Sequence, residues 1–341
     1  MSQPLLEVRD LAVQFKTLDG LVHAVDGVSF TVAKGEILGV VGESGSGKSV
    51  SVMSMLGLVP QPPGRIAGGS VLFEGTDLLR ASKRRMRQIR GEQIGMIFQD
   101  PMTALNPVMR IGKQIAEAIR THHRRTSGDA AMARAIDLLR LVGVPQPEAR
   151  VQQYPHQFSG GMRQRAMIAM AIANDPTLLI ADEPTTALDV TIQAQVLDML
   201  RRAQAETGAA TIFITHDLGV VAELAERVIV MYAGRVMESG AVRTIFASPR
   251  HPYTVGLLKS LPSLKHESQT LTPIPGNPPN LLQPIPGCPF QPRCDIGRDR
   301  EICATTRPPL AEVAPGHTSA CHFSDELAGT SPATTGAGAT V

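Results

Sequence analysis

A glycine-rich octapeptide near the start of the chain, GESGSGKS, has the residue types of a phosphate-binding loop. It follows a short apolar run and opens a segment with a helical pattern, so backbone N–H groups and the positive end of a helix would converge on one anion. The Lys48 ammonium would lie between the β- and γ-phosphates, and the Ser49 hydroxyl would ligate Mg²⁺. The simpler alternative is a glycine-rich turn with an incidental lysine, which those flanks disfavour. The residues expected to contact the phosphates are Gly42, Glu43, Ser44, Gly45, Ser46, Gly47, Lys48 and Ser49.

Two adjacent carboxylates, Asp182 and Glu183, end an apolar run later in the chain. At the carboxyl end of a strand, Asp182 would hold Mg²⁺ through water. Glu183 would then act as the general base for the attacking water, a role worth about 10²–10⁴ in rate. An apolar run that ends in Asp-Glu is common by itself, but together with the phosphate-binding loop it predicts hydrolysis of a nucleoside triphosphate.

Short apolar runs that alternate with helical patterns must position these groups. The alternation predicts an α/β fold with a parallel sheet that helices cover on both faces. Residues 5–32 predict two strands around a turn at Asp19-Gly20, and therefore an added antiparallel sheet. The strands expected in the core are 36–41, 177–181, 211–215 and 227–232, and the expected helices are 48–58, 112–121, 130–142, 161–174, 189–205 and 219–226.

The overall composition narrows the class of protein. With 341 residues, 43% of them hydrophobic, the chain is long enough for one large domain and an appendage. A net charge of +2 and 4% aromatic residues give no sign of a nucleic-acid-binding surface, which needs concentrated positive charge. No apolar run approaches the roughly 20 residues of a membrane-spanning helix, and the N-terminus lacks the features of a secretory signal. We therefore expect a cytosolic chain that contacts a membrane only through a partner.

A second candidate anion site begins at Ser159, in the run FSGGMRQR. Ser159 would cap a helix whose first residues, Gly160 and Gly161, leave its N-terminus accessible, although an ordinary capped helix is the alternative. The run resembles the LSGGQ signature of ATP-binding cassette (ABC) proteins. The resemblance implies a P-loop ABC fold with a parallel sheet core, an antiparallel β subdomain and an α-helical subdomain. It also implies a head-to-tail dimer, in which the signature of one subunit closes over the ATP held by another.

The remaining motifs of that family follow in order within residues 5–245. Gln99 resembles the Q-loop glutamine, which senses Mg²⁺ and water and leads into the segment that touches the membrane subunits. Ala187-Leu188-Asp189 resembles the D-loop, and His216 resembles the switch histidine that contacts the γ-phosphate. Phe15 stands where the family stacks an aromatic ring on adenine, although a phenylalanine in a strand is as often a core residue.

A closer resemblance is to the D-type ATPase of dipeptide/oligopeptide importers. It is carried by the runs GESGSGKSV, QDPMTALNP, QFSGGMRQR and ADEPTTALDVT, and by His251-Pro252-Tyr253-Thr254. The resemblance implies ATP hydrolysis coupled to peptide import at the cytoplasmic face of the cell membrane. The implied partners are an F-type ATPase, two membrane permeases and an extracytoplasmic peptide-binding protein. Met162 departs from the glutamine that is usual in the wider family, which puts the equivalence of the two composite ATP sites in doubt.

Other functions stay open at the level of sequence. The same motor could import another solute, such as nickel chelates, glutathione or sugars, because the cassette does not contact the cargo. A soluble ABC ATPase of DNA repair or translation would carry long coiled-coil insertions or two tandem cassettes, and the sequence has neither. A third hypothesis is an iron–sulfur regulatory module that holds ATP as a structural ligand, which ATP turnover stimulated by permeases would exclude.

The four cysteines lie together near the end of the chain, at Cys288, Cys294, Cys303 and Cys321. Disulfides are rare in a reducing cytosol, so this clustering indicates a metal or cluster site. The spacing C-x5-C-x8-C-x17-C matches neither the short pairs of structural zinc sites nor the runs of ferredoxins. Zinc and free thiols stay open as alternatives, whereas the resemblance to the importer family implies a structural [4Fe–4S] cluster.

The composition changes near residue 248, where a proline-dense stretch begins. Proline excludes a long helix there and favours an irregular segment. We therefore predict an ABC nucleotide-binding domain over 1–247, an importer-type extension with the four-cysteine site over 248–323, and a disordered tail over 324–341.

Overall fold

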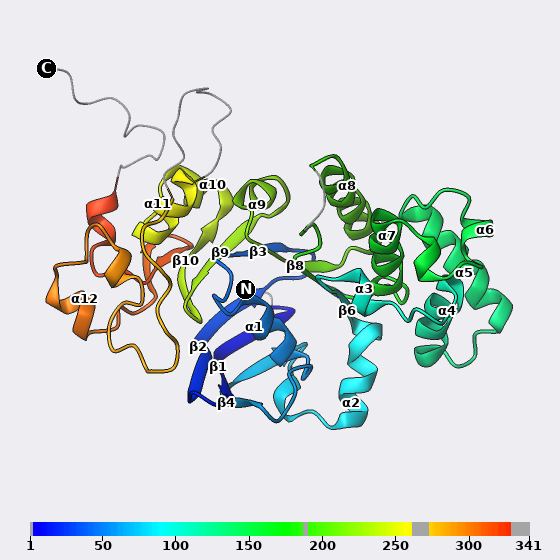
Figure 1. Cartoon of the computed structure of the whole chain (residues 1–341), viewed down its shortest axis with the longest axis horizontal. Coiled ribbons are helices and arrows are strands. Elements are labelled where there is room, and N and C mark those ends of the chain that lie inside the picture. Colours follow the sequence, from blue (N-terminus) through cyan, green and yellow to red (C-terminus); the bar gives the residue numbers. More distant parts are fainter. Residues whose placement is uncertain (1–2, 187–189, 261–272, 329–341) are drawn as a thin grey trace, which may run out of the picture. The chain divides into compact units, whose positions relative to one another are not determined.

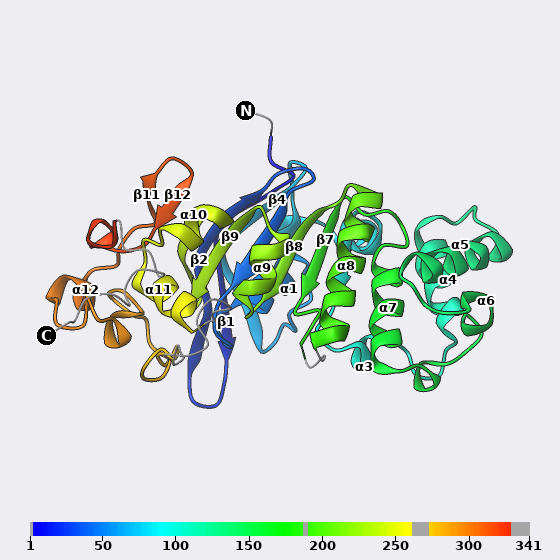
Figure 2. The same cartoon turned by 90° about the horizontal axis from the view of Figure 1, so that it is seen from above.

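Figures 1 and 2 show the computed structural model of the chain, in which residues 3–186, 190–260 and 273–328 are described. The predicted D-loop residue Asp189, with Ala187 and Leu188, lies outside the described residues. The chain forms two compact units, each built from separate stretches of sequence. Unit 1 comprises residues 1–5, 32–37 and 80–214, and unit 2 comprises residues 6–31, 38–79 and 215–341.

The strands of unit 1 are short, apolar and parallel. Strand β7 (Leu178–Asp182) lies between β6 (Ile94–Ile97) and β8 (Ala210–Thr215). Every residue of β7 and β8 is buried, as expected for a parallel sheet with both faces covered. The strands predicted at 177–181 and 211–215 are confirmed. Strand β6 is not predicted, because its four residues are too few to show a period.

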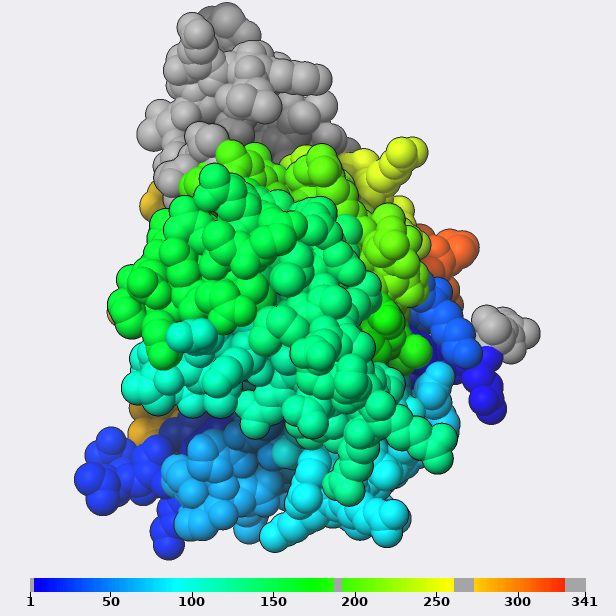
Figure 3. Space-filling view, turned by 90° about the vertical axis from the view of Figure 1, so that its right-hand side faces the viewer, coloured from blue at the N-terminus to red at the C-terminus, as the bar shows by residue number. Residues whose placement is uncertain are grey.

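Helices form most of the rest of unit 1 (Figures 1 and 2). Helix α4 (Ile111–His122) buries Ile111, Ile115 and Ile119 on one face, at the spacing of helical turns. Helices α4, α5 and α7 contact one another, and Figure 3 shows the continuous surface of this group in green. The other helices and short turns of the unit are α2 (Lys83–Gln88), η2 (Ile89–Gln93), α3 (Pro101–Ala104), α5 (Gly128–Leu141), α6 (Pro147–Arg150), η3 (Pro155–Gln157), α7 (Gly160–Ala171) and α8 (Val190–Thr207).

Unit 2 contains the antiparallel sheet predicted from the start of the chain. Its strand order is β2-β1-β4-β5, and β1 pairs with β4 from Leu6 opposite Phe73 to Phe15 opposite Gly64. The two strands expected around Asp19-Gly20 are confirmed, whereas β4 has a glycine-rich sequence that hides its strand pattern. The strands are β1 (Leu6–Lys16), β2 (Leu21–Val32), β4 (Gly64–Phe73) and β5 (Thr76–Asp77).

A second set of strands in unit 2 carries the phosphate-binding loop at one end. Strand β3 (Ile37–Val41) is parallel to β9 (Arg227–Tyr232), which is antiparallel to β10 (Arg235–Ala241). The predicted strands at 36–41 and 227–232 are thus confirmed. Strand β12 (His317–Ser319) pairs with β10, and β11 (Ala311–Ala314) pairs with β12. The C-terminal extension therefore adds strands to this sheet, which its expected irregular structure does not predict.

An aromatic cluster fixes the extension to β9. Tyr232 ends that strand, and its ring lies 4.6 Å from the ring of Tyr253 and 5.4 Å from that of Phe290, measured between centroids. All three side chains are buried. The helices and short turns of unit 2 are α1 (Lys48–Met55), η1 (Leu78–Arg80), α9 (Leu218–Leu224), α10 (Val242–Ala247), α11 (Pro252–Lys259), η4 (Gln291–Arg293), α12 (Glu301–Thr305) and η5 (Ser324–Leu327).

Candidate functional site

The predicted phosphate-binding loop joins β3 to α1 in unit 2 and holds its lysine inside the curl of the backbone. The Lys48 ammonium donates hydrogen bonds to the carbonyl oxygens of Gly42 at 2.8 Å and Glu43 at 2.9 Å, and to Ser46 Oγ at 3.3 Å. Only 5% of Lys48 is exposed. A buried ammonium needs acceptors around it, and the loop supplies them. Ser49 follows as the second residue of α1, and its role as a ligand of Mg²⁺ remains a prediction.

Glycine is required at the first position of this loop. Gly42 has a φ of +154°, and a Cβ atom there would stand 2.1 Å from the carbonyl oxygen of Met231 on β9. It would also stand 2.8 Å from Ser46 Oγ. Because a backbone oxygen cannot move aside cheaply, only a residue without a side chain lets the loop pass so close to the strand. The loop is thus shaped as a cradle for an anion.

The predicted catalytic carboxylate lies in unit 1, at the carboxyl end of β7. Asp182 is the last residue of the strand and is buried. Glu183 follows with a φ of +45°, which is uncommon for a residue with a side chain. Its N–H donates to the carbonyl oxygen of Ile214 at 3.0 Å. The backbone at Glu183 is therefore held by a hydrogen bond to β8 in this uncommon conformation.

Gln99 and Glu183 are joined by a hydrogen bond in unit 1. Gln99 Nε2 donates to Glu183 Oε2 at 3.2 Å, and Thr186 Oγ1 donates to the same oxygen at 2.7 Å. Two donors thus meet on one oxygen of the Glu183 carboxylate and fix its position in the turn after β7. Thr186 is missed by the sequence analysis, because a threonine after a turn carries no distinctive pattern.

The signature segment forms the N-terminus of α7 in unit 1. Ser159 caps the helix, and its Oγ accepts a hydrogen bond from the N–H of Met162 at 3.3 Å. Ser159 and Gly160 are exposed, and Gly161 is half-buried. Further along the helix, Gln164 Nε2 donates to the carbonyl oxygen of Pro184, directly after the catalytic turn, at 2.8 Å. The exposed N-terminus can receive an anion from a second molecule.

The other predicted residues are divided between the two units. His216 and Phe15 belong to unit 2, together with Ser49, whereas Asp182 and Gln99 belong to unit 1. His216 is exposed between β8 and α9, and Phe15 is half-buried on β1. Each occupies the end or face of a regular element, and the roles assigned to them remain predictions.

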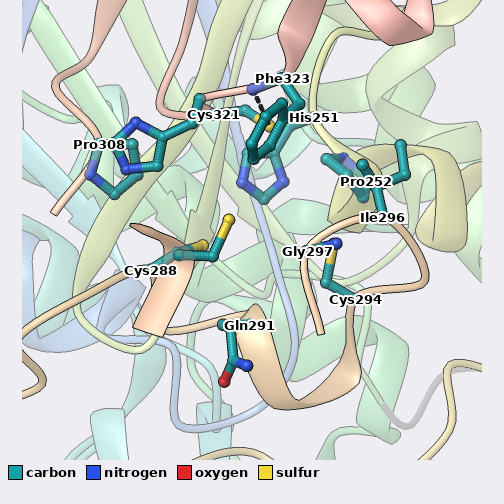
Figure 4. A pocket seen from close by; sticks show the side chains of 12 residues that line it. His251, Pro252, Cys288, Gln291, Cys294, Ile296, Gly297, Pro308, Cys321 and Phe323 are labelled. Atoms are coloured by element: carbon teal, nitrogen blue, oxygen red, sulfur yellow. Dashed lines mark hydrogen bonds between the residues drawn. The ribbon is translucent and has the colours of Figure 1, made fainter. Parts of the chain in front are cut away.

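The four cysteines line one pocket of the extension, and His251 forms part of its wall (Figure 4). None of the four is in a disulfide. Cys294 and Cys303 are buried, and the other two are half-buried. The backbone brings the first and third together, because the Cys288 N–H donates to the carbonyl oxygen of Cys303 at 2.8 Å. Four cysteines that lie far apart in the sequence thus line the same pocket.

The pocket is unfavourable for bare thiolates. Burial raises the pKa of Cys288 to about 12 and that of Cys321 to about 11, and the charges of the neighbouring thiolates add to this effect. The N–H of Gly297 donates to Cys294 Sγ at 3.1 Å, and that of Phe323 donates to Cys321 Sγ at 3.4 Å. A centre that holds these sulfurs as thiolates must therefore supply positive charge.

The spacing of the side chains argues against a single metal ion. Within residues 3–186, 190–260 and 273–328, no group of three or more His, Cys, Asp or Glu could hold one. In a zinc site a Zn–S distance of about 2.3 Å places sulfurs roughly 3.8 Å apart. A [4Fe–4S] cluster also binds four thiolates, but the described residues include no group that could hold a metal ion, so the centre stays a prediction.

Comparison with known proteins assigns the chain to a family. Residues 25–186 match the family model described as "ABC transporter", and residues 237–303 match "Oligopeptide/dipeptide transporter, C-terminal region". The chain is 54% identical over 314 residues to the oligopeptide transport ATP-binding protein OppD of Bacillus subtilis, which covers 92% of this chain and 87% of that protein. The chain belongs to this family of ABC transporter ATP-binding proteins.

Further members of the family are similar over almost their whole length. The dipeptide transport ATP-binding protein DppD of Bacillus subtilis is 50% identical over 326 residues, which is 96% of each chain. Among solved structures, the ATP-binding cassette MJ0796 in a dimeric post-hydrolysis state with ADP and Pi has a TM-score of 0.63 and 26% identity. That match covers 70% of this chain and 99% of the cassette. The α/β fold of an ABC ATPase is thus confirmed.

Membership of the ABC family gives the chain its activity. It is an ATP-hydrolysing subunit of a transporter, and its substrate and cofactor are ATP and Mg²⁺. No helix described in the structure is both long and apolar enough to cross a membrane.

Two further residues at the phosphate-binding loop are missed by the sequence analysis of this ABC protein. Tyr253 and Arg293, both in the extension, contact Glu43. Tyr253 belongs to the His-Pro-Tyr run that suggested the importer family, whereas nothing in the sequence around Arg293 indicates a role at the loop.

Proposed function

We propose that the chain energises the import of dipeptides and oligopeptides through an ABC transporter. The observation that carries the proposal is the match of residues 237–303 to the C-terminal region of oligopeptide/dipeptide transporters. The cassette alone would say little about cargo, because it does not contact the transported molecule. Import of another solute, such as a nickel chelate, glutathione or a sugar, by the same motor is the alternative.

The proposed assembly places the chain at the cytoplasmic face of the cell membrane. It pairs with an F-type ATPase, and the two ATPases act on two membrane permeases that receive peptide from an extracytoplasmic binding protein. Each ATP lies between two subunits. The exposed Ser159 and Gly160 at the start of α7, with Gly161, support this arrangement, because they can close over a γ-phosphate held by the partner. Asp189 is the D-loop residue of this proposal.

Within one composite site, the roles divide by chemistry. Lys48 and the loop bind the phosphates, while Ser49 and Asp182 hold Mg²⁺, whose charge stabilises the transferred phosphoryl group. Phe15 stacks on the adenine. ATP binding closes the dimer, closure moves the permeases through the Q-loop surface, and release of phosphate resets the system.

The hydrolytic step uses three further side chains. Glu183 is the general base for the attacking water, and Gln99 orients that water and contacts the metal ion. His216 contacts the γ-phosphate. The support for the pairing is the hydrogen bond from Gln99 Nε2 to Glu183 Oε2, since an amide and a carboxylate in contact could both bind one water.

Glu183→Gln tests the hydrolytic role. The amide keeps the shape of the side chain but cannot take a proton, so turnover is expected to fall about 10²–10⁴-fold while the Kd for ATP stays within about twofold. Phosphate release by the assembled transporter measures turnover, and a nucleotide titration measures the Kd for ATP. Glu206→Gln, at an exposed position of α8, is the matched control. Unchanged turnover in Glu183→Gln would remove Glu183 from the mechanism.

Uptake measurements test the cargo. A strain that lacks this gene should lose uptake of labelled di- and oligopeptides and regain it with the wild-type chain but not with Glu183→Gln. Uptake of nickel, glutathione and sugars is measured in parallel. Loss of one of these with peptide uptake intact would replace the peptide proposal with the alternative.

We also propose that Cys288, Cys294, Cys303 and Cys321 hold a [4Fe–4S] cluster with a structural role. The support is their convergence on one pocket. Such a cluster would tie the residues of the proposed extension (248–323) to one another, next in sequence to the proposed cassette domain (1–247). Protein purified without oxygen should contain about four irons and four sulfides per chain. Absence of both would exclude the cluster.

A further inference from the structure

Glu43, the second residue of the phosphate-binding loop, is held by the extension. Its carboxylate accepts a bidentate pair of hydrogen bonds from Arg293: Nη1 to Oε2 at 2.7 Å and Nη2 to Oε1 at 3.0 Å. Two parallel charge-assisted bonds fix both the distance and the plane of the carboxylate. All of these residues belong to unit 2.

Arg293 is itself held rigidly. Its Nε donates to the carbonyl oxygen of Pro275 at 2.8 Å, Nη2 to that of Ile274 at 3.2 Å, and Nη1 to Tyr232 Oη at 3.1 Å. Only 6% of its side chain is exposed. A guanidinium that is fixed on every side can impose its geometry on the partner, whereas a mobile surface arginine cannot.

A second contact fixes the backbone of the same residue. The N–H of Glu43 donates to Tyr253 Oη at 2.9 Å, and Tyr253 is fully buried. On its other side, the carbonyl oxygen of Glu43 accepts from Lys48 Nζ at 2.9 Å and from the N–H of Ser46 at 3.2 Å. The extension thus holds the peptide group between Gly42 and Glu43. The lysine and backbone of the loop hold the peptide group between Glu43 and Ser44.

We propose that Arg293 and Tyr253 are positioning residues of the ATP site, which act through Glu43 to hold the phosphate-binding loop in its binding conformation. Neither residue contacts phosphate. They fix the orientation of the peptide groups around Glu43, and with it the place of the Lys48 ammonium. Since preorganised donors bind an anion without reordering, loosening Glu43 lowers affinity for ATP. The inference rests on the proposed role of this loop in binding ATP.

The test is a nucleotide titration of the full chain with Mg·ATP. Arg293→Gln removes the bidentate pair and is expected to raise the Kd roughly tenfold, the equivalent of one charged hydrogen bond. Tyr253→Phe removes one hydroxyl and should raise it about threefold. Arg300→Gln is the matched control: it breaks the exposed bidentate pair of Arg300 with Glu326 in the same extension, and its Kd should stay within about twofold of wild type.

A double-mutant cycle shows whether the effect passes through Glu43. If it does, Arg293→Gln combined with Glu43→Gln raises the Kd about as much as either change alone. Effects that multiply would mean that Arg293 acts by another route and would overturn the proposal. If Arg293 only stabilised the fold, Arg293→Gln would lower the number of ATP-binding sites per chain and leave the Kd unchanged. That result would also overturn the proposal.

Two variants keep the proposal testable if Arg293→Gln does not fold. The first is Tyr253→Phe, which leaves the buried ring in place. A Kd of Tyr253→Phe equal to that of wild type would then refute the proposal. Lys48→Ala tests the underlying role of the loop. If Lys48→Ala raises the Kd for ATP and Arg293→Gln does not, only the positioning role is refuted. If Lys48→Ala leaves the Kd unchanged, the ATP site itself is refuted.

Discussion

If the four-cysteine pocket holds the proposed [4Fe–4S] cluster, replacing Gly297 with alanine is expected to expel it while the chain stays folded. The new Cβ atom would stand 2.9 Å from Cys303 Sγ and 3.4 Å from Cys294 Sγ. The first distance is about 0.6 Å shorter than an ordinary contact of about 3.5 Å. Gly297 does not have a left-handed backbone conformation, so the substitution acts through the two sulfurs and not through φ.

The cost of Gly297→Ala depends on whether the sulfur atoms of Cys294 and Cys303 can move. A free Cys303 thiol can turn aside, at a cost of about 1–3 kcal/mol for the overpacked site. A Cys303 thiolate that is bound to iron cannot turn without losing its ligand bond. Changes beside metal ligands typically cost about 10–100-fold in metal affinity, and displacement of two of the four ligands should reach the upper end of that range.

The assay is anaerobic reconstitution with iron and sulfide, followed by analysis of both per chain and by the visible absorption of the cluster. Gly68→Ala is the control, since its Cβ atom would meet no atom within 4 Å. Thermal melting of the protein before reconstitution separates loss of the fold from loss of the centre. Full iron and sulfide loading of Gly297→Ala would show that Cys294 and Cys303 do not share a centre.

Two other predictions concern stability. Burial alone would raise the pKa of Asp26, but hydrogen bonds and charges from Arg235 and Arg307 outweigh burial and lower it. The stability from this group is therefore present above the unfolded pKa of about 3.9 and is lost as pH falls through the lower folded value; Asp26→Asn should flatten the fall of Tm below about pH 4, and an unchanged acid profile would contradict this. Phe290→Ala should destabilise the chain by about 3–5 kcal/mol, measured by denaturant unfolding. Leu18→Ala, at a fully exposed position, should change the free energy of unfolding little. Equal losses of stability in the two variants would contradict a stabilising role of the aromatic cluster.

Features encoded in one stretch of sequence are predicted well. The phosphate-binding loop, the strand that ends at Asp182 and the capped helix after Ser159 each depend on neighbours within about ten residues, so residue type and spacing suffice. The contact of Gln99 with Glu183 is not predicted, because the two residues lie 84 positions apart and the resemblance assigns each of them a role without pairing them.

The contacts that hold the loop from outside could not be predicted. Tyr253 and Arg293 lie 210 and 250 residues from Glu43, and a single sequence gives no sign of pairs so far apart. Strand β4 is not predicted for a different reason. Its glycines at 64, 68 and 69 interrupt the alternation of apolar and polar residues by which a strand is recognised. The same limit applies to the cysteines, whose spacing matches no local motif although their side chains meet in one pocket.

The long separation between Glu43 and Arg293 has a consequence for how the protein is made. A ribosome adds roughly 5–20 residues per second, so the phosphate-binding loop emerges on the order of 10–50 s before Arg293 is synthesised. During that interval the nascent chain carries the loop and its lysine without the residues that hold Glu43. If these residues position the loop as proposed, tight ATP binding would be a property of the finished chain, and a truncated product of interrupted translation would compete poorly for nucleotide.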